Sequence, residues 1–159
     1  MQNRLVSSVP AVVLGLLAAC ATPGAGSAER ASFVNPPSLA KPAGYTHVVD
    51  VAAGRTIYVA GQIARDASGN LVGGRDMRAQ TEQVFRNIQA ALESRGATLA
   101  DIVQLTAYVR DMSQLAAYRE VRERVLGTSP RPASSLVGVA ALASDDYLLE
   151  VEVIAAPAH

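Results

Sequence analysis

The side chains that most often carry out chemistry are scarce in this sequence of 159 residues, which has two histidines, His47 and His159, and a single cysteine, Cys20. His47 lies in a stretch with β-strand character and has no second histidine or cysteine at metal-ligand spacing, so the sequence predicts no metal site. No serine lies in a nucleophile elbow, so a Ser–His–Asp triad is not expected. Gly73-Gly74 lacks the lysine of a phosphate-binding loop and is expected to be a plain turn.

Cys20 follows a segment that resembles a bacterial lipoprotein signal peptide. Residues 5–19 carry no charge, and the apolar run is shorter than the about 20 residues that span a bilayer. It ends in Leu17-Ala18-Ala19-Cys20, which is similar to a lipobox, where the cysteine is acylated and becomes the new N-terminus. We therefore expect residues 1–19 to be removed and Cys20 to be the lipid anchor. The protein is expected to be exported to a bacterial periplasm and held at a membrane, preferably the outer membrane, by this anchor only.

Charge and composition limit the partners of the mature chain. Loss of residues 1–19 removes Arg4 alone among the charged residues, which leaves 13 Lys and Arg against 14 Asp and Glu. A chain this close to neutrality, with no basic cluster and few aromatic residues, is not expected to bind nucleic acid. An acylated single cysteine allows no disulfide, so stability must come from the apolar core and from self-association.

The chain divides into a tether and one domain. Residues 20–44, the lipidated cysteine and a segment rich in proline and glycine, are expected to form a flexible linker, and residues 45–157 the domain. Asp76 and Ser113 are predicted to cap two helices that end near Gly96 and Gly127. Alternating or β-rich patterns predict two hairpins, 45–51 with 55–60 and 134–142 with 147–156, and a lone strand at 101–110.

This order, β-β-α-β-α-β-β, predicts an α+β fold with a single sheet and both helices on one face. The other face of the sheet would then be bare and partly apolar in a monomer. We therefore expect it to pack against other copies of the chain.

The stretch from Gly44 to Ala156 resembles the Rid family, the YjgF-type reactive-intermediate deaminases. The resemblance rests on Gly44-Tyr45, Ile57-Tyr58-Val59-Ala60-Gly61-Gln62-Ile63, Asp66 to Gly69, Gln80-Thr81 with Asn87, Gly96-Ala97, Asp101-Ile102-Val103, Tyr108-Val109-Arg110-Asp111-Met112 and Leu149-Glu150-Val151-Glu152-Val153-Ile154-Ala155. It implies a chorismate-mutase-like fold with a mixed sheet, a homotrimer with three clefts between subunits, and no metal or organic cofactor.

The resemblance also implies a site. In the deaminases of this family a tyrosine and a Gly-Gln turn line the cleft, an arginine binds the carboxylate of a 2-imino acid, and a glutamate orients the attacking water. These positions fall on Tyr45, Gly61-Gln62, Ser134 and Glu150. A family asparagine of the second helix corresponds to Arg119.

Ser134 departs from this pattern, since a neutral hydroxyl replaces a charged guanidinium. Arg131 is a candidate substitute, although a solvated loop side chain is the favoured interpretation. We expect a trimer that binds a small metabolite in its clefts, with little hydrolysis of 2-imino acids unless Ser134→Arg restores the family's arginine. One alternative is a deaminase of the 2-iminobutanoate/2-iminopropanoate type or of imines without a carboxylate. The other is a structural or chaperone-like trimer.

Overall fold

The structure, a computed structural model, describes residues 31–157 apart from residues 53 and 129. Cys20, the predicted signal peptide and His159 lie outside the described residues. The elements in chain order are β1 (Ala31–Val34), β2 (Val48–Val51), β3 (Ile57–Gln62), α1 (Met77–Glu93), a short 3₁₀ turn (Leu99–Asp101), β4 (Ile102–Val109), a second 3₁₀ turn (Met112–Gln114), α2 (Leu115–Leu126), β5 (Ala133–Gly138) and β6 (Leu149–Ala155).

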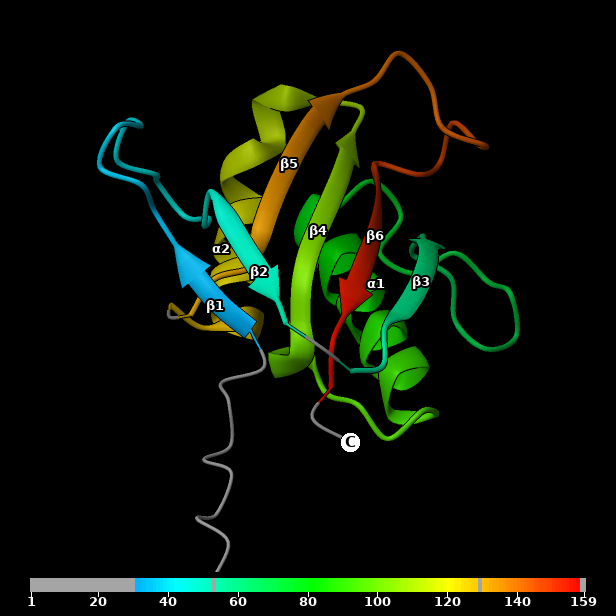
Figure 1. The fold of residues 1–159 in the computed structure, drawn as a ribbon. Helices are drawn as coiled ribbons and strands as arrows, with labels where there is room; N and C mark the ends of the chain where they lie inside the picture. Colours follow the sequence, from blue (N-terminus) through cyan, green and yellow to red (C-terminus); the bar gives the residue numbers. More distant parts are fainter. Residues whose placement is uncertain (1–30, 53, 129, 158–159) are drawn as a thin grey trace, which may run out of the picture.

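The main sheet has four strands in the order β3-β6-β4-β5. β6 is antiparallel to both of its neighbours, whereas β5 is parallel to β4, because α2 carries the chain back across the sheet between them. Figure 1 shows both helices on one side of this sheet. The predicted α+β fold with a mixed sheet and helices on one face is confirmed.

Strand pairing differs from the two predicted hairpins. β2 pairs with β1 in a separate two-stranded sheet, with Phe33 opposite Val49, and it does not pair with β3. β1 lies within the segment predicted to be a tether. β5 and β6 are separated by β4, so the predicted hairpin of residues 134–142 and 147–156 is also wrong.

The two helices begin at different kinds of cap. The Asp76 side chain accepts hydrogen bonds from the backbone N–H groups of Arg78 and Ala79 at the start of α1, as predicted. Gly96 follows the end of α1 with a φ of +67°. Ser113 does not cap the second helix, because Asp111 caps the preceding 3₁₀ turn and accepts hydrogen bonds from both the backbone N–H and the hydroxyl of Ser113.

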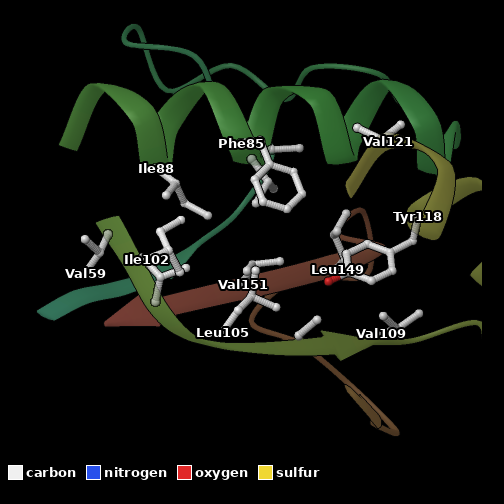
Figure 2. Packing of buried hydrophobic residues seen from close by; sticks show 14 of the residues in the cluster. Val59, Phe85, Ile88, Ile102, Leu105, Val109, Tyr118, Val121, Leu149 and Val151 are labelled. Atoms are coloured by element: carbon white, nitrogen blue, oxygen red, sulfur yellow. The ribbon is translucent and has the colours of Figure 1, made fainter. Parts of the chain in front are cut away.

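The core lies between the helices and the sheet (Figure 2). It is built from buried side chains of α1, α2, β4 and β6, among them Phe85, Ile88, Tyr118, Val121, Leu105, Val109, Leu149 and Val151. Each such side chain contributes about 1.5–3 kcal/mol on burial. Because the helices cover one face of the sheet, only the opposite face and the ends of the strands are open to a ligand or a partner.

A buried amide holds the loops at one end of this core. Gln80 is fully buried, and its Nε2 donates to the carbonyl oxygens of Gly74 (2.6 Å) and Asp146 (2.7 Å) while its Oε1 accepts from the N–H of Leu148 (2.9 Å). A β-carbon on Gly73 would lie 2.8 Å from that of Ala79, so the glycine pair is a tight structural turn. Within the described ranges no helix is long and apolar enough to cross a membrane.

Candidate functional site

Two cavities meet at Gly44, between the β1–β2 sheet and the C-terminal end of α2. The larger cavity, about 540 Å³, is bordered by Phe33, Asn35, Lys41, Pro42, Gly44, Tyr45, Thr46, Thr128, Pro130 and Arg131. The smaller one, about 10 Å³, is bordered by Gly44, Leu105, Arg122, Glu123, Leu126, Gly127, Arg131, Pro132 and Ser134. Gly44 and Arg131 belong to both linings, so the cavities adjoin. The structure therefore places Tyr45, Arg131 and Ser134 around two adjoining cavities, with Arg131 in both linings.

Gly44 lets two guanidinium groups approach the backbone. A β-carbon at this position would lie 2.7 Å from Nη2 of Arg122 and 2.8 Å from Nη1 of Arg131. These two nitrogens are therefore at most 5.5 Å apart, the sum of those distances. Two like charges at that separation repel each other by about 3 kcal/mol at an effective dielectric constant of about 20. A counter-charge at this point would be strongly attracted.

Arg131 is held in place by its own neighbours. Its Nε donates to the carbonyl oxygen of Thr128 (3.0 Å), and its Nη1 is 3.3 Å from Oε1 of Glu123. Only 23% of the side chain is exposed, which differs from the expected solvated loop residue. Arg131 therefore faces the cavities, with part of its charge balanced by Glu123.

Tyr45 is positioned by the segment that follows it. Thr46 is buried, donates its backbone N–H to the carbonyl oxygen of Pro132 (3.1 Å) and forms an isolated parallel bridge with Ala133. The Tyr45 ring packs edge-to-face against His47, with 5.1 Å between ring centroids. These contacts place Tyr45 beside the residues that precede Ser134.

Glu150 and Gly61 form a second group on the other side of the sheet. The Glu150 carboxylate lies against the Cα of Gly61, where a β-carbon would overlap it. β3 carries a register shift between Val59 and Gln62, and the Gln62 side chain donates to the carbonyl oxygen of Ala60 (3.0 Å). Glu150 on β6 lies opposite Tyr108 on β4, and both side chains are on the sheet face that the helices do not cover.

Ser134 points to the opposite face. It is paired with Leu105, a fully buried residue on the helix-covered side, and both side chains border the smaller cavity. Within one chain Ser134 and Glu150 therefore do not share a pocket. The predicted site divides into a Gly44 group, with Tyr45, Arg131 and Ser134, and a Gly61 group, with Gln62 and Glu150.

The uncovered sheet face has a groove of about 380 Å³, bordered by Tyr58, Val59, Ala60, Gln104, Thr106, Glu152, Val153 and Ile154. Tyr58 is 77% exposed. The Tyr108 hydroxyl donates to Oε1 of Glu152 (3.2 Å). Two effects raise the pKa of Tyr108: the larger is desolvation, and the next is this hydrogen bond. The face thus combines apolar side chains with carboxylates.

Sequence reasoning missed Arg122 and considered Arg119 on the same helix, for which a surface position was the favoured interpretation. Arg119 is exposed on α2, whereas Arg122 is half-buried and borders the smaller cavity. One signal was available, since Arg122 comes four residues after the fully buried Tyr118 and so lies on the same side of the helix. Burial raises the pKa of Tyr118 to about 12, and the nearby charge of Arg122 opposes this shift. Among the described residues no group of three or more His, Cys, Asp or Glu is arranged to hold a metal ion.

The profile of the family described as endoribonuclease L-PSP matches residues 37–157. The chain belongs to this family, also called Rid, YjgF or RutC. A RutC family protein of Pyrococcus abyssi is 42% identical over 117 residues, which cover 72% of this chain and 88% of the relative. A protein of Dermatophagoides farinae named 2-iminobutanoate/2-iminopropanoate deaminase is 33% identical over 111 residues, 69% of this chain and 84% of the relative.

Solved structures of the Rid family agree with the fold. A Yersinia pestis protein of unknown function, described as a member of the conserved Rid family, is similar with a TM-score of 0.72 and 39% identity, over 80% of this chain and 99% of that one. RidA from an Antarctic Psychrobacter has a TM-score of 0.60 and 35% identity, over 74% of this chain and 92% of that one. The predicted Rid fold is thus confirmed at the level of the domain.

Proposed function

We propose that this Rid-family chain binds a small metabolite carrying a carboxylate in the cavities around Gly44. The observation that carries the proposal is that Arg131 borders two adjoining cavities, the one of about 540 Å³ together with Tyr45 and the smaller one together with Ser134. That volume suits a small molecule. Arg131, Arg122 and Lys41 outnumber the single carboxylate of Glu123 in the two linings, so the local charge favours an anion.

We further propose that the binding unit is a homotrimer, in which a neighbouring copy brings its Gly61 group to the Gly44 group. Two observations support this arrangement. Ser134 and Glu150 face opposite sides of the sheet within one chain, and the uncovered face carries the exposed Tyr58 and Val137. Cys20, as the acylated residue, would hold such a trimer at a membrane through its lipid alone.

Deamination is the second candidate, because one relative at 33% identity is named 2-iminobutanoate/2-iminopropanoate deaminase. In that reaction water adds to the imine carbon and ammonia leaves, giving a 2-keto acid. Glu150 is the residue that would orient the water. Ser134 argues for a low rate, because the cations around Gly44 come from α2 and from the loop before β5 and not from position 134. The carboxylate would then be held at a different place, and small misplacements of the reacting carbon are costly.

A titration of the purified protein with 2-oxobutanoate, followed by calorimetry, tests the proposed function. Its methyl ester, which lacks the charge, is the matched control. We expect saturable binding of the acid and at least about tenfold weaker binding of the ester. Equal binding of acid and ester, or no binding of either, would contradict the proposal.

The deaminase alternative is separated by a coupled assay. A dehydratase generates the 2-imino acid, and formation of the 2-keto acid is compared with the spontaneous rate. We expect little acceleration by the wild-type protein. Clear acceleration that disappears in Glu150→Gln would instead favour the deaminase.

A further inference from the structure

We infer that Arg122 has taken over the carboxylate-binding role of the arginine that the Rid resemblance expects at position 134. The inference rests on the proposed function and assigns a residue to it. In this arrangement the site keeps a positive charge, although position 134 has none. The guanidinium enters the site from α2 instead of from β5.

Ser134 leaves space beside Arg122. Ser134 and Arg122 border the same small cavity, whose volume of about 10 Å³ holds no more than about one water molecule. The guanidinium of Arg122 also approaches Gly44, where a β-carbon would be 2.7 Å from Nη2. A short side chain at position 134 and a missing side chain at position 44 together leave room for this group.

Arg131 and Arg122 differ in whether a carboxylate balances their charge. Arg131 is paired with Glu123 and also bonded to Thr128. No ion pair in the described part of the chain joins Arg122 to a carboxylate, although Arg122 is half-buried. A partly desolvated cation without a counter-ion is stabilised by an incoming anion more than one that is already paired.

The side chain of Arg122 is directed toward the sheet and not into solvent. Arg122 borders the smaller cavity together with Leu105 and Ser134, both of which belong to strands of the main sheet. Its Nη2 also approaches the backbone at Gly44.

Positions 122 and 134 should then be mutually exclusive sites for arginine. A third guanidinium beside Arg122 and Arg131 would enter a cavity of about 10 Å³ that two like charges already border. This changes the expectation drawn from the resemblance, in which Ser134→Arg alone restores the family's site. Only the exchange Arg122→Ser with Ser134→Arg would do so.

The test is a titration of four variants with 2-oxobutanoate and its methyl ester: Arg122→Gln, Ser134→Arg, the double exchange Arg122→Ser/Ser134→Arg, and Arg95→Gln. Arg95 lies in the turn after α1 and borders neither cavity, so its variant is the control for loss of one positive charge. Thermal unfolding and sedimentation of each variant establish that it is folded and assembled like the wild type.

We expect Arg122→Gln to weaken binding of the acid at least about tenfold and to leave binding of the ester unchanged. Arg95→Gln should bind both like the wild type. Ser134→Arg alone should bind no more tightly than the wild type and unfold at a lower temperature, whereas the double exchange should return the acid affinity to within about threefold of wild type.

Wild-type affinity in Arg122→Gln would overturn the inference while leaving the proposed function intact. Tighter binding by Ser134→Arg with Arg122 still present would also overturn it. If the double exchange does not fold, the comparison of Arg122→Gln with Arg95→Gln still decides. Failure of the wild-type protein to discriminate acid from ester would overturn the proposed function and this inference together.

Discussion

In the Gly61 group, β3 and the Glu150 side chain of β6 approach each other closely at Gly61. The carboxylate of Glu150 occupies the volume into which any side chain at position 61 would grow. The backbone of Gly61 does not have the positive φ that by itself favours glycine, so the requirement is one of space. A glycine is therefore needed here because it leaves Glu150 in its position.

We predict that Gly61→Ala displaces Glu150 and lowers the free energy of unfolding by about 1–3 kcal/mol through overpacking. Urea denaturation measures the change. Glu150→Ala removes the obstructing carboxylate, so the double variant should regain most of the loss. Additive effects of the two substitutions would show that the contact is not the cause.

Tyr118 offers a second prediction at a single residue. Its buried hydroxyl makes no hydrogen bond of good geometry among the described residues, although Arg122 lies close enough to oppose the rise of its pKa. Tyr118→Phe should therefore raise the free energy of unfolding at pH 7 by up to about 1 kcal/mol. The folded-state pKa of about 12 exceeds the ordinary 10.0, so the unfolded chain releases this proton first as pH rises. The free energy of unfolding of the wild type should therefore decrease as the pH rises from 10 to 12, and that of the variant should decrease less. Unfolding curves at pH 7, 10 and 11 check both effects. Lower stability of Tyr118→Phe at pH 7 would mean that the hydroxyl is satisfied in solution.

At the scale of elements, α1 is joined to the loop before β6 by one buried amide. Gln80→Ala would leave the N–H of Leu148 and the carbonyl oxygens of Gly74 and Asp146 without their partner. We predict a loss of about 2–4 kcal/mol in the free energy of unfolding, since each buried polar group left unpaired costs about 1–3 kcal/mol.

The matched control is Gln89→Ala, which removes an exposed amide from the same helix that bonds only to Glu93. It should change stability by less than about 0.5 kcal/mol. Similar losses in both variants would show that the buried hydrogen bonds of Gln80 are not the cause of the loss.

The elements differ in how far local sequence determines them. α1 could be predicted because its signals are local in sequence: Asp76 caps its start, an apolar stripe runs along it, and Gly96 follows its end. β1 could not, because four residues beside a proline-rich stretch form a strand only when Val48–Val51 lies alongside. The partner of each strand is likewise set by the whole chain: turn residues 143–146 suggest a hairpin, yet β4 lies between β5 and β6.

The site follows the same division. The resemblance assigned a site to Tyr45, Ser134, Gly61 and Glu150, but the two faces of the sheet to which they belong depend on strand register. The helical spacing of Arg122 from Tyr118 indicated only which side of α2 Arg122 occupies. Its approach to Gly44 joins residues 78 positions apart, and no local pattern indicates such a contact.

At the scale of the whole molecule, we predict that a protein beginning at Ala31 sediments with three times the chain mass. Tyr58→Asp places a charge on the uncovered sheet face, where it should dissociate the trimer because a buried unpaired charge is strongly unfavourable. Leu39→Asp, at a residue that is 50% exposed outside the main sheet, is the control and should leave the mass unchanged. A wild-type monomer at micromolar concentration would exclude both the trimer and clefts shared between copies.

The predicted anchor is tested on the full chain. Cys20→Ala removes the thiol to be acylated, so the variant should move from the membrane fraction to the soluble fraction of the expressing bacterium. Cys20→Ser gives the same expectation with a closer change in shape. Retention of either variant on membranes after a salt wash would contradict lipid anchoring.

The order of the strands also determines when the sheet can assemble. Among the described strands β6 comes last in sequence, yet it lies between β3 and β4 and joins them. Until Leu149–Ala155 is available, β3 has no neighbour in the main sheet, and the helices have no central strand on which to close the core. The native sheet of a nascent chain can therefore close only after residue 155 has been synthesised. The long-range pairing of β3 with β6 should make that folding slow compared with a helical protein of this size.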